Sequence, residues 1–189
     1  MTDKLNKLVK LMSGRKKPYV EKTSEDVYRE VAGEFDQFEP EDIAQIGGVE
    51  SQHGKYNKPL KGGSATGLFQ FQPKTAEYLK SGSSETLENP STQAELMKKY
   101  LEKNKAESTE EAHTMHNLGP TGSKKFLQAS DDTPISKIIP KAVIKANPGL
   151  YNVKTVGEAR ARIKNKLESG EESFEFTPTF QELFKKEKK

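Results

Sequence analysis

The stretch that decides the fold runs from Glu41 to Phe71 and reads EDIAQIGGVESQHGKYNKPLKGGSATGLFQF. Its first part predicts an amphipathic helix, because Ile43 and Ile46 recur at helical spacing. Glu50 follows Ile43 by one heptad and projects onto the same apolar face. Burial disfavours the charged form of a carboxyl group, and a carboxyl that keeps its proton can act as a general acid. Glu50 is therefore a candidate catalytic acid.

Proline and glycine set the limits of this helix. Pro40 fits the first turn, where its missing N–H has no helical partner. Gly47 and Gly48 each lower helix propensity by about 1 kcal/mol relative to alanine. We expect them to admit another backbone, or a ligand, close to the turn before Glu50. The glycines and prolines that come next predict a loop or a small hairpin leading to Gly67.

Composition sets wide limits on the protein class. A chain of 189 residues with 32% hydrophobic and 31% charged residues suits one domain with a small core. The absence of cysteine excludes disulfides, thiolate nucleophiles and sulfur-ligated zinc. A net charge of +3 is too weak to indicate a partner. Because no aromatic-basic motif is present, we expect no nucleic acid partner.

Helical spacing and capping residues predict further helices. Their starts fall at Ser24, Pro73, Pro90, Ser108, Ser123 and Thr155, with a short apolar helical stretch from Ile135 to Ile144 interrupted near Pro140. Gly119 and Pro120 should end the helix that follows Ser108. Together with the loop before Gly67, these elements predict a mainly α (α+β) fold.

The two ends of the chain differ from the middle in composition. Residues 1–20 predict a basic amphipathic arm, docked on the domain or a partner or lying on a membrane surface. This arm lacks an uninterrupted apolar segment, so we expect neither a secretory signal nor a membrane span. Residues 21–170 form the predicted domain, and residues 171–189 form an aromatic and basic tail.

Two patterns raise the question of a metal. Glu50 and His53 form Glu-x-x-His, which supplies two ligands in di-iron bundles, but those sites need a second copy that this chain lacks. His113 and His116 are spaced to share a zinc ion, yet no third ligand has motif spacing. We therefore expect no metal and no cofactor.

Four blocks of sequence resemble one enzyme family. They are IGGVES at 46–51, ATGLFQFQPKTA at 65–76, the pair Asn89-Pro90 leading to Tyr100-Leu101, and MHNLGP at 115–120. In this order they are similar to the motifs of the soluble lytic transglycosylases, lysozyme-like enzymes that cleave peptidoglycan. The blocks span about 75 residues. The resemblance implies a lysozyme-like domain with a small β-hairpin or loop region beside the active-site cleft.

The resemblance also implies a mechanism and a site. Glu50 would protonate the bond between N-acetylmuramic acid and N-acetylglucosamine, then accept the proton of the muramic 6-hydroxyl to leave a 1,6-anhydro product. The implied substrate-binding residues are Ser51, Gln70, Tyr100, His116 and Asn117. Gln70 is equally suited to fixing the loop. A tyrosine at the position of Tyr100 is more often a core residue than a substrate contact. His116 departs from the family, which has tyrosine at this position.

A later run, PKAVIKANPGLY followed by TVGEAR, resembles transglycosylase domains of bacteriophage structural proteins. It implies an enzyme of the phage virion, made in the host cytoplasm, with peptidoglycan strands as substrate and other virion proteins as partners of the terminal arms. A phage endolysin is an alternative. So is a hydrolytic lysozyme, or muramidase, with Glu85 or Asp131 as second carboxylate. A non-catalytic wall-binding virion protein is the third alternative.

Overall fold

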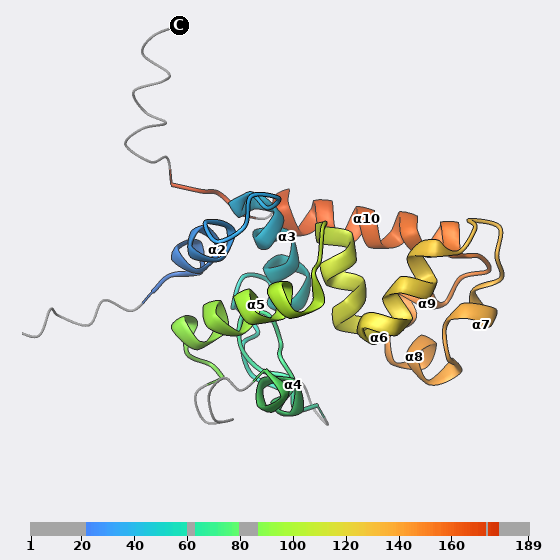
Figure 1. Cartoon of the computed structure of the whole chain (residues 1–189), viewed down its shortest axis with the longest axis horizontal. Helices are drawn as coiled ribbons and strands as arrows, with labels where there is room; N and C mark the ends of the chain where they lie inside the picture. Colours follow the sequence, from blue (N-terminus) through green and yellow to red (C-terminus); the bar gives the residue numbers. More distant parts are fainter. Residues whose placement is uncertain (1–21, 60–62, 80–86, 173, 178–189) are drawn as a thin grey trace, which may run out of the picture.

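The computed structural model describes residues 22–59, 63–79, 87–172 and 174–177, and this part of the chain is mainly helical (Figure 1). Its helices are α2 (Ser24–Ala32), α3 (Pro40–Ser51), α4 (Pro73–Tyr78), α5 (Pro90–Asn104), α6 (Thr109–Gln128), α7 (Ile135–Ile138), α8 (Lys141–Ala146), α9 (Pro148–Tyr151) and α10 (Val156–Glu172). No helix in these ranges is long and apolar enough to cross a membrane. The predicted arm at 1–20 lies outside the described residues.

The predicted mainly α class is confirmed, and the β component is small. Within the described ranges, β pairing consists of two isolated antiparallel bridges, Thr66 with Phe71 and Pro134 with Thr155. The described residues between α3 and α4 therefore form no hairpin of regular strands, and the first bridge closes the turn from Thr66 to Phe71.

Local capping explains where most helices begin. Pro40 occupies the first position of α3, as predicted. The Asn89 side chain accepts hydrogen bonds from the backbone N–H groups of the first turn of α5. The predicted start of α2 needs one correction, because Thr23 is the N-cap and forms a capping box with Asp26. The Ser24 hydroxyl instead donates to the backbone carbonyl of His53, at 2.9 Å.

Helix α6 is kinked at Gly119, where φ is 69° and ψ is 166°. This backbone conformation is almost restricted to glycine. Pro120 begins the second arm of the helix. At this position a backbone N–H would have no acceptor within the helix, so proline loses no hydrogen bond. The two helices predicted on either side of Gly119 are therefore the two arms of α6. The hydroxyls of Thr114 and Ser123 lie 2.6 Å apart across the kink.

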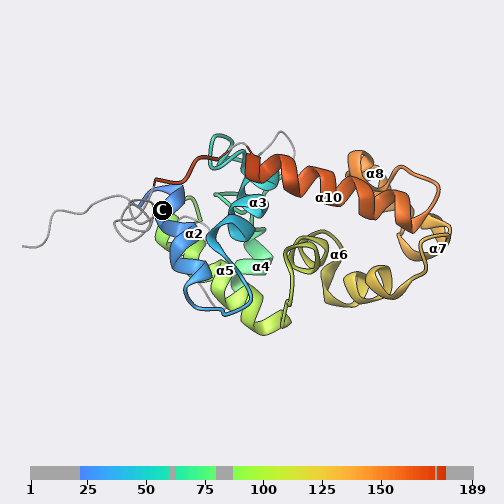
Figure 2. The ribbon, with the colours of Figure 1, turned by 90° about the horizontal axis from the view of Figure 1, so that it is seen from above.

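The kink divides the buried residues into two cores. The first core is built by α2, α3, α5 and the loop before α4, with Tyr28, Phe69 and Phe71 among its largest side chains. The second is built by the later arm of α6 and by α7, α9 and α10, around Phe126 and Tyr151. Figures 1 and 2 both show α10 running along the other helices of the second core to reach α3. The C-terminal end of α3 therefore lies where the two cores meet.

A glycine pair allows α3 and α10 to approach closely. A Cβ atom on Gly48 would lie 2.6 Å from the carbonyl oxygen of Gly170, and one on Gly170 would lie 2.6 Å from that of Gln45. A Cβ on Gly47 would overlap the Tyr28 hydroxyl. The predicted close backbone approach before Glu50 is therefore present, and α10 is the partner.

The start of the predicted tail packs on the first core. Helix α10 continues past residue 170, and beyond it the rings of Phe174 and Phe176 lie 5.1 and 6.3 Å from that of Tyr28, between centroids. Arg29 donates a hydrogen bond to the carbonyl of Thr177, at 2.9 Å. Residues 174–177 thus cover the outer face of α2.

Candidate active site

Glu50 lies in the last turn of α3, at the junction of the two cores, with 16% of its side chain exposed. Two imidazoles from α6 approach its carboxyl group. His113 Nε2 lies 3.6 Å from Oε1, and His116 Nε2 lies 3.9 Å from Oε2. Burial, together with the smaller electrostatic effects of Lys166 and His116, lowers the pKa of His113 to about 3. His113 is therefore neutral at neutral pH, and its contact with Glu50 is not an ion pair.

Two tyrosines complete the surroundings of Glu50. The hydroxyls of Tyr100, from α5, and Tyr151, from α9, are buried without a hydrogen-bond partner among the described residues. Burial raises the pKa of both phenols, and the nearby negative charge of Glu50 raises it further. Both side chains therefore stay protonated and retain an O–H that can be donated to a group entering the site.

Ser51 and Gln70 organise the loop between α3 and α4. The buried Ser51 hydroxyl donates to Leu68 O at 2.7 Å and accepts from the N–H of Gly54 at 2.8 Å. The Gln70 amide donates to the carbonyls of Tyr56 and Gly67, both at 2.9 Å. These contacts agree with the structural alternative for Gln70, and substrate binding by either residue stays a prediction.

Tyr100, His116 and Asn117 lie closer to the carboxyl group. The rings of Phe71, Tyr100 and His116 form a cluster with centroids 5.5–6.0 Å apart. Asn117 lies beside His113, since its amide donates to the His113 carbonyl at 2.9 Å. Three of the five predicted binding residues thus gather around the groups that contact Glu50.

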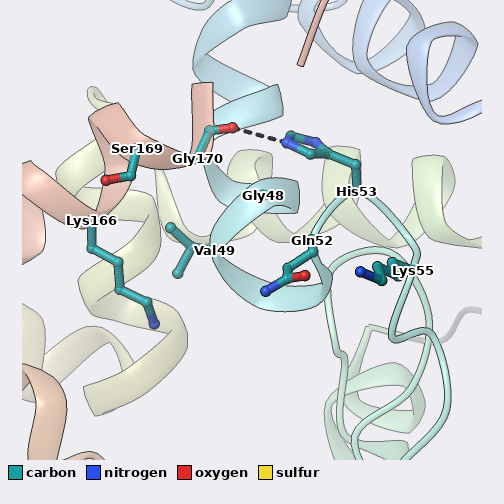
Figure 3. Close-up of a pocket in the computed structure, with 8 residues that line it drawn as sticks. All are labelled: Gly48, Val49, Gln52, His53, Lys55, Lys166, Ser169 and Gly170. Carbon is teal, nitrogen blue, oxygen red and sulfur yellow. Dashed lines mark hydrogen bonds between the residues drawn. The ribbon is translucent and has the colours of Figure 1, made fainter. Parts of the chain in front are cut away.

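Cavities lie on two sides of this cluster. A cavity of about 320 Å³ is lined by Gln72, Tyr78, Tyr100, Asn104 and His116 and by Gly119 at the kink. Two larger cavities, of about 530 and 430 Å³, follow α10 and share Lys166 and Ser169. Gly48 and Val49, next to Glu50 in sequence, line the first of these two (Figure 3). Residues that precede Glu50 in sequence therefore line the space along α10, and His116, which contacts Glu50, lines the space toward α4.

Neither pattern considered for a metal forms such a site. Both ring nitrogens of His53 are engaged elsewhere, since Nδ1 contacts the Tyr28 hydroxyl at 2.8 Å and Nε2 contacts the Gly170 carbonyl at 2.9 Å. Figure 3 shows the second of these contacts. His113 and His116 both contact Glu50. Over the described ranges, no three His, Asp or Glu side chains are grouped to hold a metal.

No known protein-family model and no curated protein matches the chain.

Two residues near Glu50, His113 and Tyr151, are not predicted from the sequence as its partners. His113 was considered only as a zinc ligand, although its spacing from Asn117 places both on one helix face. Tyr151 falls inside the run PKAVIKANPGLY that resembles phage transglycosylase domains, so the signal for it was present.

Proposed function

We propose that this protein is a peptidoglycan lytic transglycosylase in which Glu50 is the acid and base. The observation that carries the proposal is the setting of Glu50, a largely buried carboxyl group at the junction of two cores, whose neighbours in sequence and in contact line two cavities. Side chains able to donate or accept protons surround it on α5, α6 and α9. The four sequence blocks that resemble the family supply the substrate class.

In this mechanism Glu50 donates its proton to the glycosidic oxygen between N-acetylmuramic acid and N-acetylglucosamine. The bond from the muramic C1 to that oxygen breaks, and the muramic 6-hydroxyl oxygen bonds to C1. The hydroxyl proton passes to the Glu50 carboxylate, which returns the enzyme to its starting state without consuming water. One carboxyl group is sufficient because the nucleophile belongs to the substrate.

The neighbouring side chains suit this cycle. Neutral His113 places no full positive charge against Glu50, so it does not favour the carboxylate over the acid as an ion-pair partner would. Tyr100 and Tyr151 offer neutral O–H groups near the carboxyl. His116 occupies the position where the family has tyrosine, and its Nε2 lies 3.9 Å from Glu50 Oε2, which is longer than a hydrogen bond.

The hydrolytic alternative needs a second carboxylate about 5–9.5 Å from the acid. Asp131, one of the two candidates, is paired with Arg160, whose guanidinium also donates to three carbonyls at the end of α6. Glu85, the other candidate, lies outside the described residues. The groups shown beside Glu50 are the imidazoles of His113 and His116, and the charge of Glu50 acts on the phenols of Tyr100 and Tyr151. The transglycosylase mechanism needs no carboxylate beyond Glu50.

Mass spectrometry of digested peptidoglycan tests the proposal. We expect 1,6-anhydro ends, which differ from the reducing ends of a hydrolase by one water. The Glu50→Gln variant, tested at the same concentration, should give neither product. Reducing ends from the wild type would instead identify a muramidase, and intact glycan that still binds the protein would identify a non-catalytic wall-binding protein.

The setting in which the enzyme acts is a separate part of the proposal. The resemblance of the 140–160 region to phage structural proteins supports a virion-associated enzyme that the particle delivers to the cell wall. Proteomics of purified, nuclease-treated particles tests this. Finding the protein only in lysed host cells would favour the endolysin alternative.

A further inference from the structure

The charges of this chain are divided between its two halves. Residues 22–119 contain 11 Lys and Arg against 17 Asp and Glu, whereas residues 120–170 contain 10 Lys and Arg against 4 Asp and Glu. The overall net charge of +3 conceals this asymmetry. The part of the chain that builds the second core, residues 120–170, is therefore basic. Residues of α10, within this part, line both of the larger cavities.

These two cavities form one feature, which we call the α10 groove. Its lining includes Gly48, Gln52, Lys55, Arg162, Lys166 and Ser169. In Figure 3, Lys166 of α10 and Lys55 of the loop after α3 appear on either side of Gln52. Among the described residues that line the groove, three are cationic and none is acidic. A concave surface with one sign of charge concentrates ligands of the opposite sign.

The cations of the groove have no carboxylate partners among the described residues. Arg162 donates to the backbone carbonyls of Gly149 and Asn152, at 3.2 and 3.4 Å, which leaves its charge uncompensated. Lys55 lies over the Tyr56 ring, with Nζ 5.5 Å from the centroid. By contrast Lys164, on the same helix but outside the groove, pairs with Glu168.

The groove adjoins the Glu50 site. Gly48 and Val49 line it directly before Glu50, and Leu150 lines it directly before Tyr151. The charge of Lys166 lowers the pKa of His113, which contacts Glu50. The groove is therefore formed by the same helices that carry Glu50 and Tyr151, so we infer that a chain bound at Glu50 extends into it.

We propose that the α10 groove binds the carboxylates of the peptide stems carried by the glycan strand, an inference that rests on the proposed function. Lys and Arg supply the charge that carboxylates require. Gln52, Asn147 and Asn165 also line the groove, and their amides offer acceptors as well as donors. A peptide satisfies both kinds of group through the N–H and C=O of every peptide unit, whereas the charged groups of a phosphate polymer supply acceptors alone.

The first test compares two substrates. Uncrosslinked strands that keep their stems are prepared beside the same strands after an amidase has removed the stems. We expect kcat/KM to be about tenfold higher on the strands with stems, a difference of about 1.4 kcal/mol. The preference should weaken as salt is added, because the charges that we invoke are exposed. Equal kcat/KM values on the two substrates would overturn the inference while leaving the proposed function intact.

Charge-neutral variants locate the effect. The Lys55→Gln/Lys166→Gln double variant should reduce the ratio of the two kcat/KM values to about one. The matched control is Lys164→Gln, which removes a cation from α10 outside the groove and should leave the ratio unchanged. An unchanged ratio in the double variant, or an equal loss in the control, would assign the preference to overall charge and not to the groove.

A binding experiment separates this inference from the proposed function. The free stem tetrapeptide is titrated by NMR or calorimetry into Glu50→Gln, and into Glu50→Gln that also carries Lys55→Gln/Lys166→Gln. We expect binding to the first protein and at least tenfold weaker binding to the second. Equal binding to the two, no binding, or preferred binding of poly(glycerol phosphate) would overturn the inference. If the wild type cleaves neither strand, the proposed function fails, and the titration still decides what the groove binds.

Discussion

Nε2 of His113 lies 3.6 Å from Oε1 of Glu50, and the imidazole is 1% exposed. Because burial lowers the pKa of His113, this contact joins a carboxyl group to a neutral ring. A protonated histidine at the same distance would attract the carboxylate and oppose its protonation. The depth of His113 below the surface thus bears directly on the acid role proposed for Glu50.

Glu50→Gln should abolish cleavage without unfolding the protein. Glutamine has nearly the same shape but supplies no acidic proton, and loss of a general acid and base typically costs 10²–10⁴-fold in rate. Turbidity clearing of purified cell walls measures activity, and thermal unfolding provides the control. Wall clearing at the wild-type rate by the folded variant would remove Glu50 from the mechanism.

His113 should make the protein less stable as the pH falls. Its folded-state pKa of about 3 lies below the value of about 6.5 expected in the unfolded chain, so the unfolded chain binds more protons between these limits. The stability of the folded state is therefore unaffected by His113 above about pH 6.5 and should fall by about 2 kcal/mol at pH 5. Urea unfolding measures the free energy of unfolding of the wild type and of His113→Gln at pH 7 and pH 5. The decrease from pH 7 to pH 5 should be larger in the wild type, and the difference between the two proteins is the contribution of His113.

An NMR titration of the His113 ring gives an independent check that does not depend on whether the variant folds. The ring should remain neutral throughout the range in which the native protein persists. A midpoint near 6.5 would contradict both the burial argument and the neutral contact with Glu50.

Gly48→Ala should destabilise the crossing of α3 and α10. The new methyl group would lie 2.6 Å from Gly170 O and 2.7 Å from Gly170 Cα, and backbone atoms must move to admit it. Overpacking of this kind costs about 1–3 kcal/mol. Gly149→Ala is the matched control, since a Cβ there meets nothing within 4 Å. Chemical denaturation should separate the two variants, and equal stabilities would refute the proposed close approach.

Gly119→Ala should destabilise the protein for a different reason. A Cβ on Gly119 meets no atom within 4 Å, so space is not limiting. The backbone at φ 69° and ψ 166° is instead strained for any residue with a side chain, at about 1–3 kcal/mol. Because Gly119 also lines the cavity beside His116, we expect lower activity together with lower stability. A variant as stable as the wild type would mean that the kink does not require this conformation.

Two truncations should separate the tail into a docked part and a remainder. Ending the chain after Thr177 removes none of the described contacts, so the thermal midpoint should stay within about 1 °C of the wild type. Ending it after Glu172 also removes Phe174 and Phe176 from Tyr28 and should lower the midpoint by several degrees, at about 2–4 °C per kcal/mol. Identical midpoints for the two truncations would show that residues 174–177 contribute no stability.

Most helix starts could be predicted from sequence because capping is local. Pro40, Asn89 and Ser108 each act within the first turn of the helix that they begin. The start of α2 was misplaced by one residue because Thr23 and Ser24 are both suited to capping. The Ser24 hydroxyl is bound to the carbonyl of His53, a contact between distant parts of the chain that sequence spacing does not reveal.

The sequence by itself determined the helical class and singled out Glu50, because a carboxyl group on an apolar helix face is visible in the periodicity of one segment. Only the tertiary structure decided what surrounds that carboxyl. His113 contacts it from α6, and the charge of Glu50 acts on Tyr151 of α9, which belongs to the core beyond the bend at Gly119. The two cores are joined where α10 packs against α3 at Gly48. Periodicity reports which face of a helix is buried, whereas the partner of that face is set by contacts between segments far apart in the chain.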